Sequence, residues 1–277
     1  MTSLTAMSRS SSTWARATRA GVVVGVSSAL VLSACGLTAG SSEYDYSCPE
    51  DSNGDELPLV VLGFLDLSAS GRSEPILSER LDTLQVELER VADCEGRATV
   101  IGFSDSTASN VVLLDRHFDA EGATEVARDR DIPDAIDASM DDIRANIDGA
   151  LDRLPADGTD VSAMFVLAAD QLPGLGPDTA IEMYAFTDGI STAGSVNLND
   201  PELTPSRAVE LADAAVPVDL SRLVRIDVRG IGKVAGDVQP PTDYVAAISA
   251  YVTELCRQAT GDTNGTKCTV RTITTPR

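Results

Sequence analysis

Residues 60–71, VVLGFLDLSASG, join an apolar run of strand length to a loop of oxygen-bearing side chains. A continuous apolar run indicates a strand buried on both faces, as in a parallel sheet covered by helices. Asp66, Ser68 and Ser70 follow at alternate positions just past the strand, and open α/β sheets bind ligands at the carboxyl ends of their strands. Three hard oxygen ligands in one turning loop can converge on a small cation. The spacing becomes a strong signal only when matching donors occur elsewhere in the chain.

Helical and strand patterns alternate along the rest of the chain. Leucines spaced four and three apart, beginning at Leu77, predict a helix with Pro75 in its first turn. A second long helix is predicted from about Pro133 to Leu154, where Pro155 ends it, and the segment before it is charged and poorly periodic. Further strands are predicted at 98–103, 110–114, 181–186, 223–228 and 269–273, and further helices at 161–169, 205–215 and 244–255.

This alternation predicts an α/β fold of three layers, with a mostly parallel central sheet and helices on both faces, as in Rossmann-like proteins. The predicted strands 98–103 and 110–114 are separated by only a few residues. A short connection favours an antiparallel hairpin, since parallel strands need a long crossover. One edge strand of the sheet is therefore expected to be antiparallel.

The N-terminal residues 1–34 have the features of an export signal. A basic region with three arginines precedes an apolar stretch, residues 21–32, that is too short to span a bilayer. The sequence LSACG around Cys35 resembles the lipobox of bacterial lipoproteins, which implies cleavage before Cys35 and a lipid on its thiol. The alternative is an ordinary secretory signal with an incidental cysteine. We expect a lipid anchor on the extracytoplasmic face of the cell membrane, a flexible tether over 35–57 and a folded domain over 58–277.

The chain is strongly acidic. It has 21 basic and 43 acidic side chains, a net charge of −22. Removing the three arginines of the signal leaves 18 basic against 43 acidic side chains, a net charge of −25. Such a surface argues against binding to nucleic acid or to anionic lipid, and most of these acids are expected simply to solvate the surface.

Four cysteines follow Cys35, and an even number in an exported chain suggests two disulfides. In a parallel sheet, the first helix returns to the edge at which the first strand starts. The cysteine before that strand, Cys48, can therefore meet Cys94 at the helix end. By the same reasoning Cys256 ends the last helix and Cys268 begins the last strand. Zinc is the alternative, but there is no C-x-x-C pair and a single histidine.

Two later segments supply the matching oxygen donors. Thr159 precedes a predicted helix, and Asp188 directly follows a predicted strand in the sequence Thr-Asp-Gly. With Asp66, Ser68 and Ser70, they make a pattern that resembles the von Willebrand factor A (vWA) domain. The metal-ion-dependent adhesion site of that family consists of a D-x-S-x-S loop, a threonine and a T-D-G aspartate, and all five positions match here.

The resemblance extends over about residues 58–275 and includes the order of the elements. It implies that the two serines and the threonine touch a divalent cation, while the two aspartates often act through water. A partner protein would then complete the metal's coordination with an Asp or Glu. Hydroxyls and water suit Mg²⁺, with Mn²⁺ or Ca²⁺ as alternatives.

Two other functions remain open from the sequence. One is a fold of the same type whose site holds no metal. The other is a hydrolase with Ser68 or Ser70 as nucleophile, but the loop is not G-x-S-x-G and the one histidine, His117, lies in an edge segment. A phosphatase of the haloacid dehalogenase type would require a second Asp in place of Ser68. We therefore expect a binding protein without catalytic residues.

Overall fold

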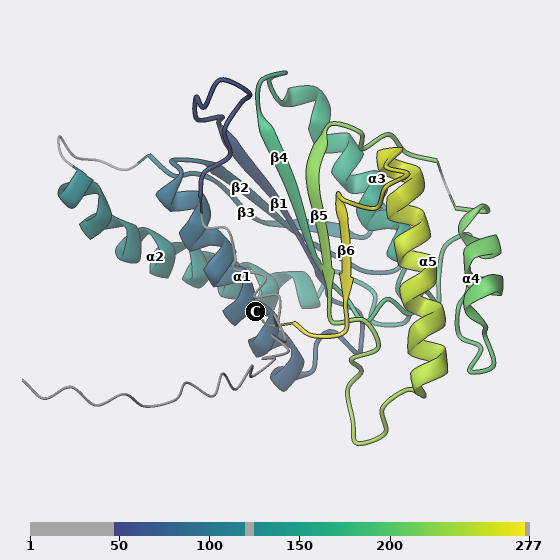
Figure 1. Cartoon of the computed structure of the whole chain (residues 1–277). Helices are drawn as coiled ribbons and strands as arrows, with labels where there is room; N and C mark the ends of the chain where they lie inside the picture. The colour runs from purple at the N-terminus through teal and green to yellow at the C-terminus, as the bar shows by residue number, and fades with distance from the viewer. Residues whose placement is uncertain (1–46, 120–124, 216, 275–277) are drawn as a thin grey trace, which may run out of the picture. The chain divides into compact units, whose positions relative to one another are not determined.

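A single six-stranded sheet forms the centre of the computed structural model, which describes residues 47–119, 125–215 and 217–274. Its strands are β1 (Leu59–Asp66), β2 (Arg97–Phe103), β3 (Asn110–His117), β4 (Ala180–Phe186), β5 (Leu223–Arg229) and β6 (Cys268–Arg271). They lie in the order β3-β2-β1-β4-β5-β6 (Figure 1). Only β2 and β3 pair antiparallel, so the predicted sheet with one antiparallel edge strand is confirmed.

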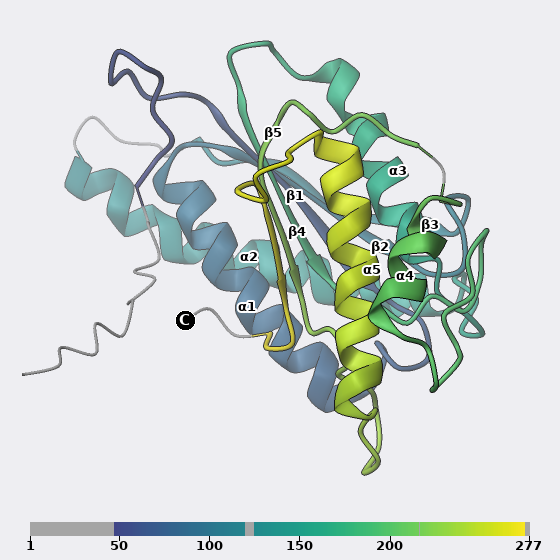
Figure 2. The same cartoon turned by 45° about the vertical axis from the view of Figure 1, so that its right-hand side comes forward.

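Helices cover both faces of the sheet, as predicted. On one face lie α1 (Glu74–Asp93) and α2 (Glu125–Leu151), and on the other lie α3 (Val161–Gln171), α4 (Pro205–Ala212) and α5 (Thr242–Thr260) (Figures 1 and 2). A short 3₁₀ helix, Leu172–Gly174, follows α3. Strand β1 is buried along its whole length because alternate residues pack into the two cores: Val61 with α1 and α2, and Leu62 with the other three helices.

Helix α2 differs from the prediction at both ends. It begins at Glu125, eight residues before the expected start at Pro133, which lies inside the helix. A proline removes one backbone donor but need not end a helix, and the charged residues before it have no apolar stripe that could have revealed the extra turns. The helix ends at Leu151 rather than Leu154 and continues as a turn, in which the Arg153 and Leu154 N–H groups both donate to the Ala150 carbonyl. Pro155 has no N–H with which to extend the helix further.

Both predicted disulfides are present. Cys48–Cys94 joins residues 46 apart in the sequence, and Cys256–Cys268 joins residues 12 apart. Cys48 precedes β1, Cys94 caps α1 and Cys268 opens β6. Since β1 and β6 run in the same direction, both bridges lie at the edge of the sheet where the parallel strands begin, which we call the amino edge.

The segment before β1 forms a small closed turn from residue 49 onward. Glu50 and Glu56 make an isolated antiparallel bridge, and the Asp51 carboxylate accepts hydrogen bonds from two backbone N–H groups inside the turn. The predicted signal, residues 1–34, and the predicted lipidation site Cys35 lie outside the described residues. Within the described part of the chain, no helix combines the length and apolar character needed to cross a membrane.

Candidate metal centre

Four of the five predicted metal-site side chains meet at the carboxyl edge of β1 and β4. Asp66 is the last residue of β1, and Asp188 lies two residues beyond β4. The two strands are paired up to Leu65 and Phe186, so their ends lie side by side. Neighbouring parallel strands therefore bring together two segments that are more than a hundred residues apart.

Asp66 is fully buried and holds the loop that follows it. The Ser68 N–H donates to Asp66 Oδ1 at 2.9 Å, and the Thr187 hydroxyl donates to Asp66 Oδ2 at 2.8 Å. The chain then turns at Gly71, where any Cβ would overlap the Asp66 carbonyl oxygen. Glycine is needed here because of this close approach of backbone to backbone.

The two serines connect this loop to Asp188. The Oγ atoms of Ser68 and Ser70 lie 3.4 Å apart, and Ser70 Oγ donates to Asp188 Oδ2 at 2.5 Å. The other carboxylate oxygen, Asp188 Oδ1, accepts from the Ile190 N–H at 2.9 Å. Ser68, Ser70 and Asp188 thus form one continuous chain of oxygen atoms.

Thr159 lies on a neighbouring loop and is also buried. This loop is attached to the first one, since the Ala69 N–H donates to the Ala156 carbonyl at 3.0 Å. The Thr159 N–H donates to Thr192 Oγ1 at 3.0 Å, and Asp160 caps α3 by accepting from the Ser162 N–H. Within the described residues, no hydrogen bond joins the Thr159 hydroxyl to the other four side chains. Its loop is placed beside the site, but its side chain is not connected to the chain of oxygen atoms.

Two residues with a structural part in the site were missing from the sequence-based set. The Thr187 hydroxyl donates to the buried carboxylate of Asp66. In the sequence, only its position directly before Asp188 could have indicated a part in the site. Arg80, in α1, donates from Nη1 to the Asp66 carbonyl oxygen at 2.9 Å. No local pattern could have indicated Arg80, because it reaches the loop only through the packing of α1.

The charges at the site favour a cation. Burial, followed by the nearby charge of Asp66, raises the pKa of Asp188 to about 6, against the opposing hydrogen bonds from Ser70 and Ile190. Burial lowers the pKa of Arg80, while Asp66 and Asp188 act in the opposite direction. Two buried carboxylates therefore face a single buried guanidinium, and negative charge remains in excess.

The donor set suits a hard ion held by few charged ligands. In the described part of the chain, no group of three or more His, Cys, Asp or Glu side chains is arranged to hold a metal. An ion here would thus be held by hydroxyls and two carboxylates, with water completing its shell. Mg²⁺ keeps several waters and prefers oxygen ligands, so these residues fit it.

His117 lies too far from the serines to serve as their base. It pairs with Arg97 at the start of β2, whereas Asp66 pairs with Phe103 at the other end of that strand. Six residues of extended strand separate the two ends by about 20 Å. His117 instead contacts Asp119 at 2.8 Å, and both side chains are exposed.

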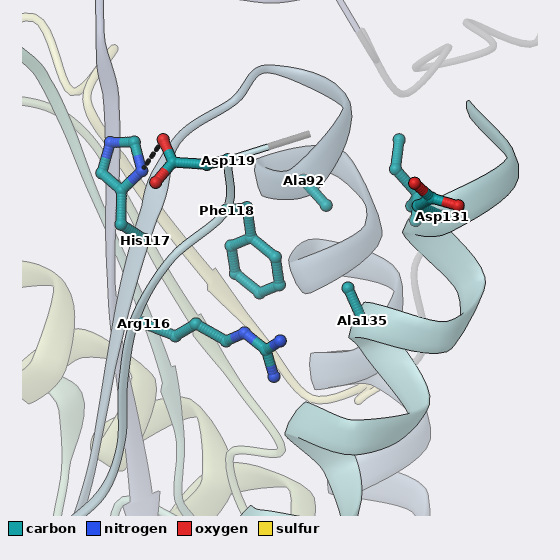
Figure 3. A pocket seen from close by; sticks show the side chains of 8 residues that line it. Ala92, Arg116, His117, Phe118, Asp119, Asp131 and Ala135 are labelled. Atoms are coloured by element: carbon teal, nitrogen blue, oxygen red, sulfur yellow. Dashed lines mark ion pairs between the residues drawn. The ribbon is translucent and has the colours of Figure 1, made fainter. Parts of the chain in front are cut away.

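A hollow of about 130 Å³ lies beside His117, between the end of β3 and helices α1 and α2 (Figure 3). Arg116 stacks over the Phe118 ring at 5.6 Å and donates to Ser139 Oγ at 3.1 Å. Asp131 and Ala135 of α2 line the opposite wall. None of the five predicted metal-site residues lines this hollow.

Comparison with known proteins identifies no family: no family model and no curated protein matches the chain. Among solved structures, it is similar to the conserved hypothetical protein BatB from Bacteroides thetaiotaomicron, with 13% identity over 78% of this chain and 90% of that one, at a TM-score of 0.37. Proximal thread matrix protein 1 from the mussel byssus is similar with 14% identity over 79% of this chain and 44% of that one, at a TM-score of 0.37. The pilus adhesin SpaC from Lactobacillus rhamnosus GG, in its open conformation, is similar with 10% identity over 81% of this chain and 28% of that one, at a TM-score of 0.40. Similarities at TM-scores below 0.5 identify neither a family nor a function.

Proposed function

We propose that this chain is a binding module of the vWA type that holds a divalent cation at the carboxyl edge of its sheet. The observation that carries the proposal is the contact of Ser70 Oγ with Asp188 Oδ2 at 2.5 Å, which joins the Asp66–Ser68–Ser70 loop to the segment after β4. Without a ligand, a second carboxylate beside a buried one is energetically unfavourable, because like charges repel strongly away from water. A cation between them removes that repulsion.

The proposed ion is Mg²⁺, with Ser68, Ser70 and Thr159 as its nearest protein ligands and Asp66 and Asp188 behind them. Neutral hydroxyls leave most of the positive charge of the ion available to an incoming ligand. The chemistry that the ion supplies is attraction for one further carboxylate, an Asp or Glu of a protein partner. The carboxylates Asp66 and Asp188 orient the serines and balance the charge, and no side chain is assigned a catalytic part.

The first test is whether the ion stabilises the fold. A ligand that binds only the folded state raises its stability, by about 2.7 kcal/mol at a hundred times the dissociation constant. We expect the melting temperature of the wild type to be higher in Mg²⁺ than in EDTA, and Asp66→Asn to abolish the difference. Asn is preferable to Ala because its amide oxygen can still accept from the Ser68 N–H and its NH2 can donate to the Thr187 hydroxyl, whereas Ala would leave both buried donors without a partner.

Asp115→Asn, on the edge strand β3, is the control, since its carboxylate pairs with the exposed Arg97 away from the site. It should keep the full response to Mg²⁺. Calorimetric titration of Mg²⁺ and Mn²⁺ into each variant provides the second readout. If the wild type takes up neither ion at millimolar concentration, the carboxyl edge is not a metal site.

We also propose that the module is anchored to the extracytoplasmic face of the membrane by a lipid on Cys35. The supporting observation is the sequence LSACG around Cys35, which resembles a lipobox. Further along the chain, Cys48 is bonded to Cys94 at the amino edge, opposite the proposed metal site. The thirteen residues from Cys35 to Cys48 span at most about 45 Å when extended.

Cys35→Ser tests the anchor. The wild type should partition into detergent and carry a lipid mass on Cys35, whereas the variant should be released or stay unprocessed. Mass spectrometry of the N-terminal peptide provides the decisive measurement. Wild-type protein that is soluble, cleaved after Ala34 and free of lipid would rule the anchor out.

A further inference from the structure

Arg80 lies beneath the metal-site loop and is almost completely enclosed. Its side chain is 1% exposed, although a guanidinium is rarely buried without a carboxylate bonded to it. Nη1 donates to the Asp66 carbonyl oxygen at 2.9 Å, and Nη2 is buried and has no hydrogen-bond partner. The loop closes over this side chain at Gly71, where an added Cβ would come within 2.8 Å of Nη1.

The carboxylates near Arg80 fall into two groups. Glu79 forms an ion pair with Lys233, so its charge is already matched by another cation. Asp66 and Asp188 have no cationic hydrogen-bond or ion-pair partner among the described residues, and both act electrostatically on Arg80. The buried guanidinium is therefore a fixed positive charge that acts on both proposed metal-site carboxylates.

Relying on the proposed metal site, we infer that Arg80 is a positioning residue that serves as an internal counter-cation of that site. Its charge offsets one of the two buried negative charges, which allows the loop to keep its shape without a metal. Its hydrogen bond to the Asp66 carbonyl oxygen holds the start of the loop in place. The site would then gain and release its ion without unfolding, because the ion is not the sole balance for Asp66 and Asp188.

A double-mutant cycle in EDTA tests this inference without any metal. The variants are Arg80→Met, Asp188→Asn and the double variant, compared by melting temperature. We expect Arg80→Met to lower the melting temperature by at least about 5 °C. Asp188→Asn in that background should recover at least half of the loss, because it removes the charge that Arg80 balances. If the effects of the two single variants on the melting temperature simply add, Arg80 does not act as a counter-cation.

Two further variants separate charge from packing. Arg80→Lys keeps the charge and should lose less stability than Arg80→Met. Arg72→Met is the matched control, because Arg72 also donates to a carbonyl of the same loop, that of Leu67, at 2.6 Å. Its loss should not be recovered by Asp188→Asn, and recovery equal to that of Arg80→Met would overturn the inference.

The double variant still tests the inference if Arg80→Met does not fold. A folded Arg80→Met/Asp188→Asn double variant then supports the inference, and an unfolded one contradicts it. A parallel series in Mg²⁺ keeps the two hypotheses apart. A wild type that does not respond to Mg²⁺ refutes the metal site, while the cycle in EDTA still decides the part played by Arg80.

Discussion

The two edges of the sheet are stabilised by different means. The amino edge is closed by covalent bonds, since both disulfides, Cys48–Cys94 and Cys256–Cys268, lie there. At the carboxyl edge, the described contacts are hydrogen bonds between loops, such as Ser70 to Asp188, around buried charges of the same sign. The covalent bonds and the proposed binding site therefore lie at opposite edges of the sheet. One edge limits how far the chain can open, and the other keeps the unbalanced charge that a ligand can neutralise.

A second buried cluster of charges shows that the imbalance is specific to the carboxyl edge. Between α1 and the strands β4 and β5, Glu182 pairs with Arg90, while Glu87 and Asp227 both pair with Arg229. Two more arginines approach Asp227, at 3.4 and 3.5 Å, so in this described cluster four guanidinium groups face three carboxylates. Buried carboxylates of the domain are therefore matched with arginines where they serve stability. At the proposed metal site, by contrast, two carboxylates face a single guanidinium group, that of Arg80.

The largest expected effect comes from opening the amino edge. A disulfide restricts the unfolded chain more when it closes a longer loop. Replacing Cys48 and Cys94 by Ser should cost about 4 kcal/mol, and replacing Cys256 and Cys268 about 3 kcal/mol, for loops of 46 and 12 residues. Urea denaturation of both double variants measures the two costs. A greater loss for the shorter loop would show that native-state contacts, rather than chain entropy, set the contribution of these bridges.

A smaller effect is expected at the carboxyl edge, in the dependence of stability on pH. The pKa of Asp188 is raised to about 6 in the folded protein, so the folded state binds the proton more tightly than the unfolded state does. In EDTA, the stability from this group is fully present below about pH 4 and is lost as the pH rises through about 6. We expect a loss on the order of 2 kcal/mol, since each unit of pKa corresponds to about 1.4 kcal/mol.

Asp188→Asn should remove this dependence, because the amide does not titrate and cannot repel Asp66. Denaturation curves at pH 4, 5, 6 and 7 for the wild type and the variant provide the comparison. Mg²⁺ should increase the stability of the wild type most at pH 7, the highest pH of the series. A wild-type stability that instead rises from pH 4 to pH 6 in parallel with the variant would show that Asp188 is not repelled by its neighbour.

Local patterns in the sequence are sufficient to predict the sheet and the edge at which four of the five candidate side chains meet. The buried strand that ends at Asp66 was predicted from a continuous apolar run, and the order of strands and helices then placed the cysteines at a common edge. The pairing of Ser70 with Asp188 follows from the same logic, because parallel strands end at the same edge of a sheet. These features depend on periodicity and chain direction, which a sequence records directly.

Three other features depend on tertiary packing and could not be predicted from the sequence. The start of α2 at Glu125 has no apolar stripe to mark it, so the prediction placed it at Pro133. Arg80 reaches the loop through the packing of α1 against β1, and the hydroxyl of Thr187, just after β4, reaches Asp66 at the end of the neighbouring strand β1. A buried charge is acceptable only among the partners that packing provides, and a sequence does not show which partners those are. The order of elements in the sequence is thus enough to place these oxygen-bearing side chains at one edge of the sheet, whereas tertiary packing sets how their charge is balanced.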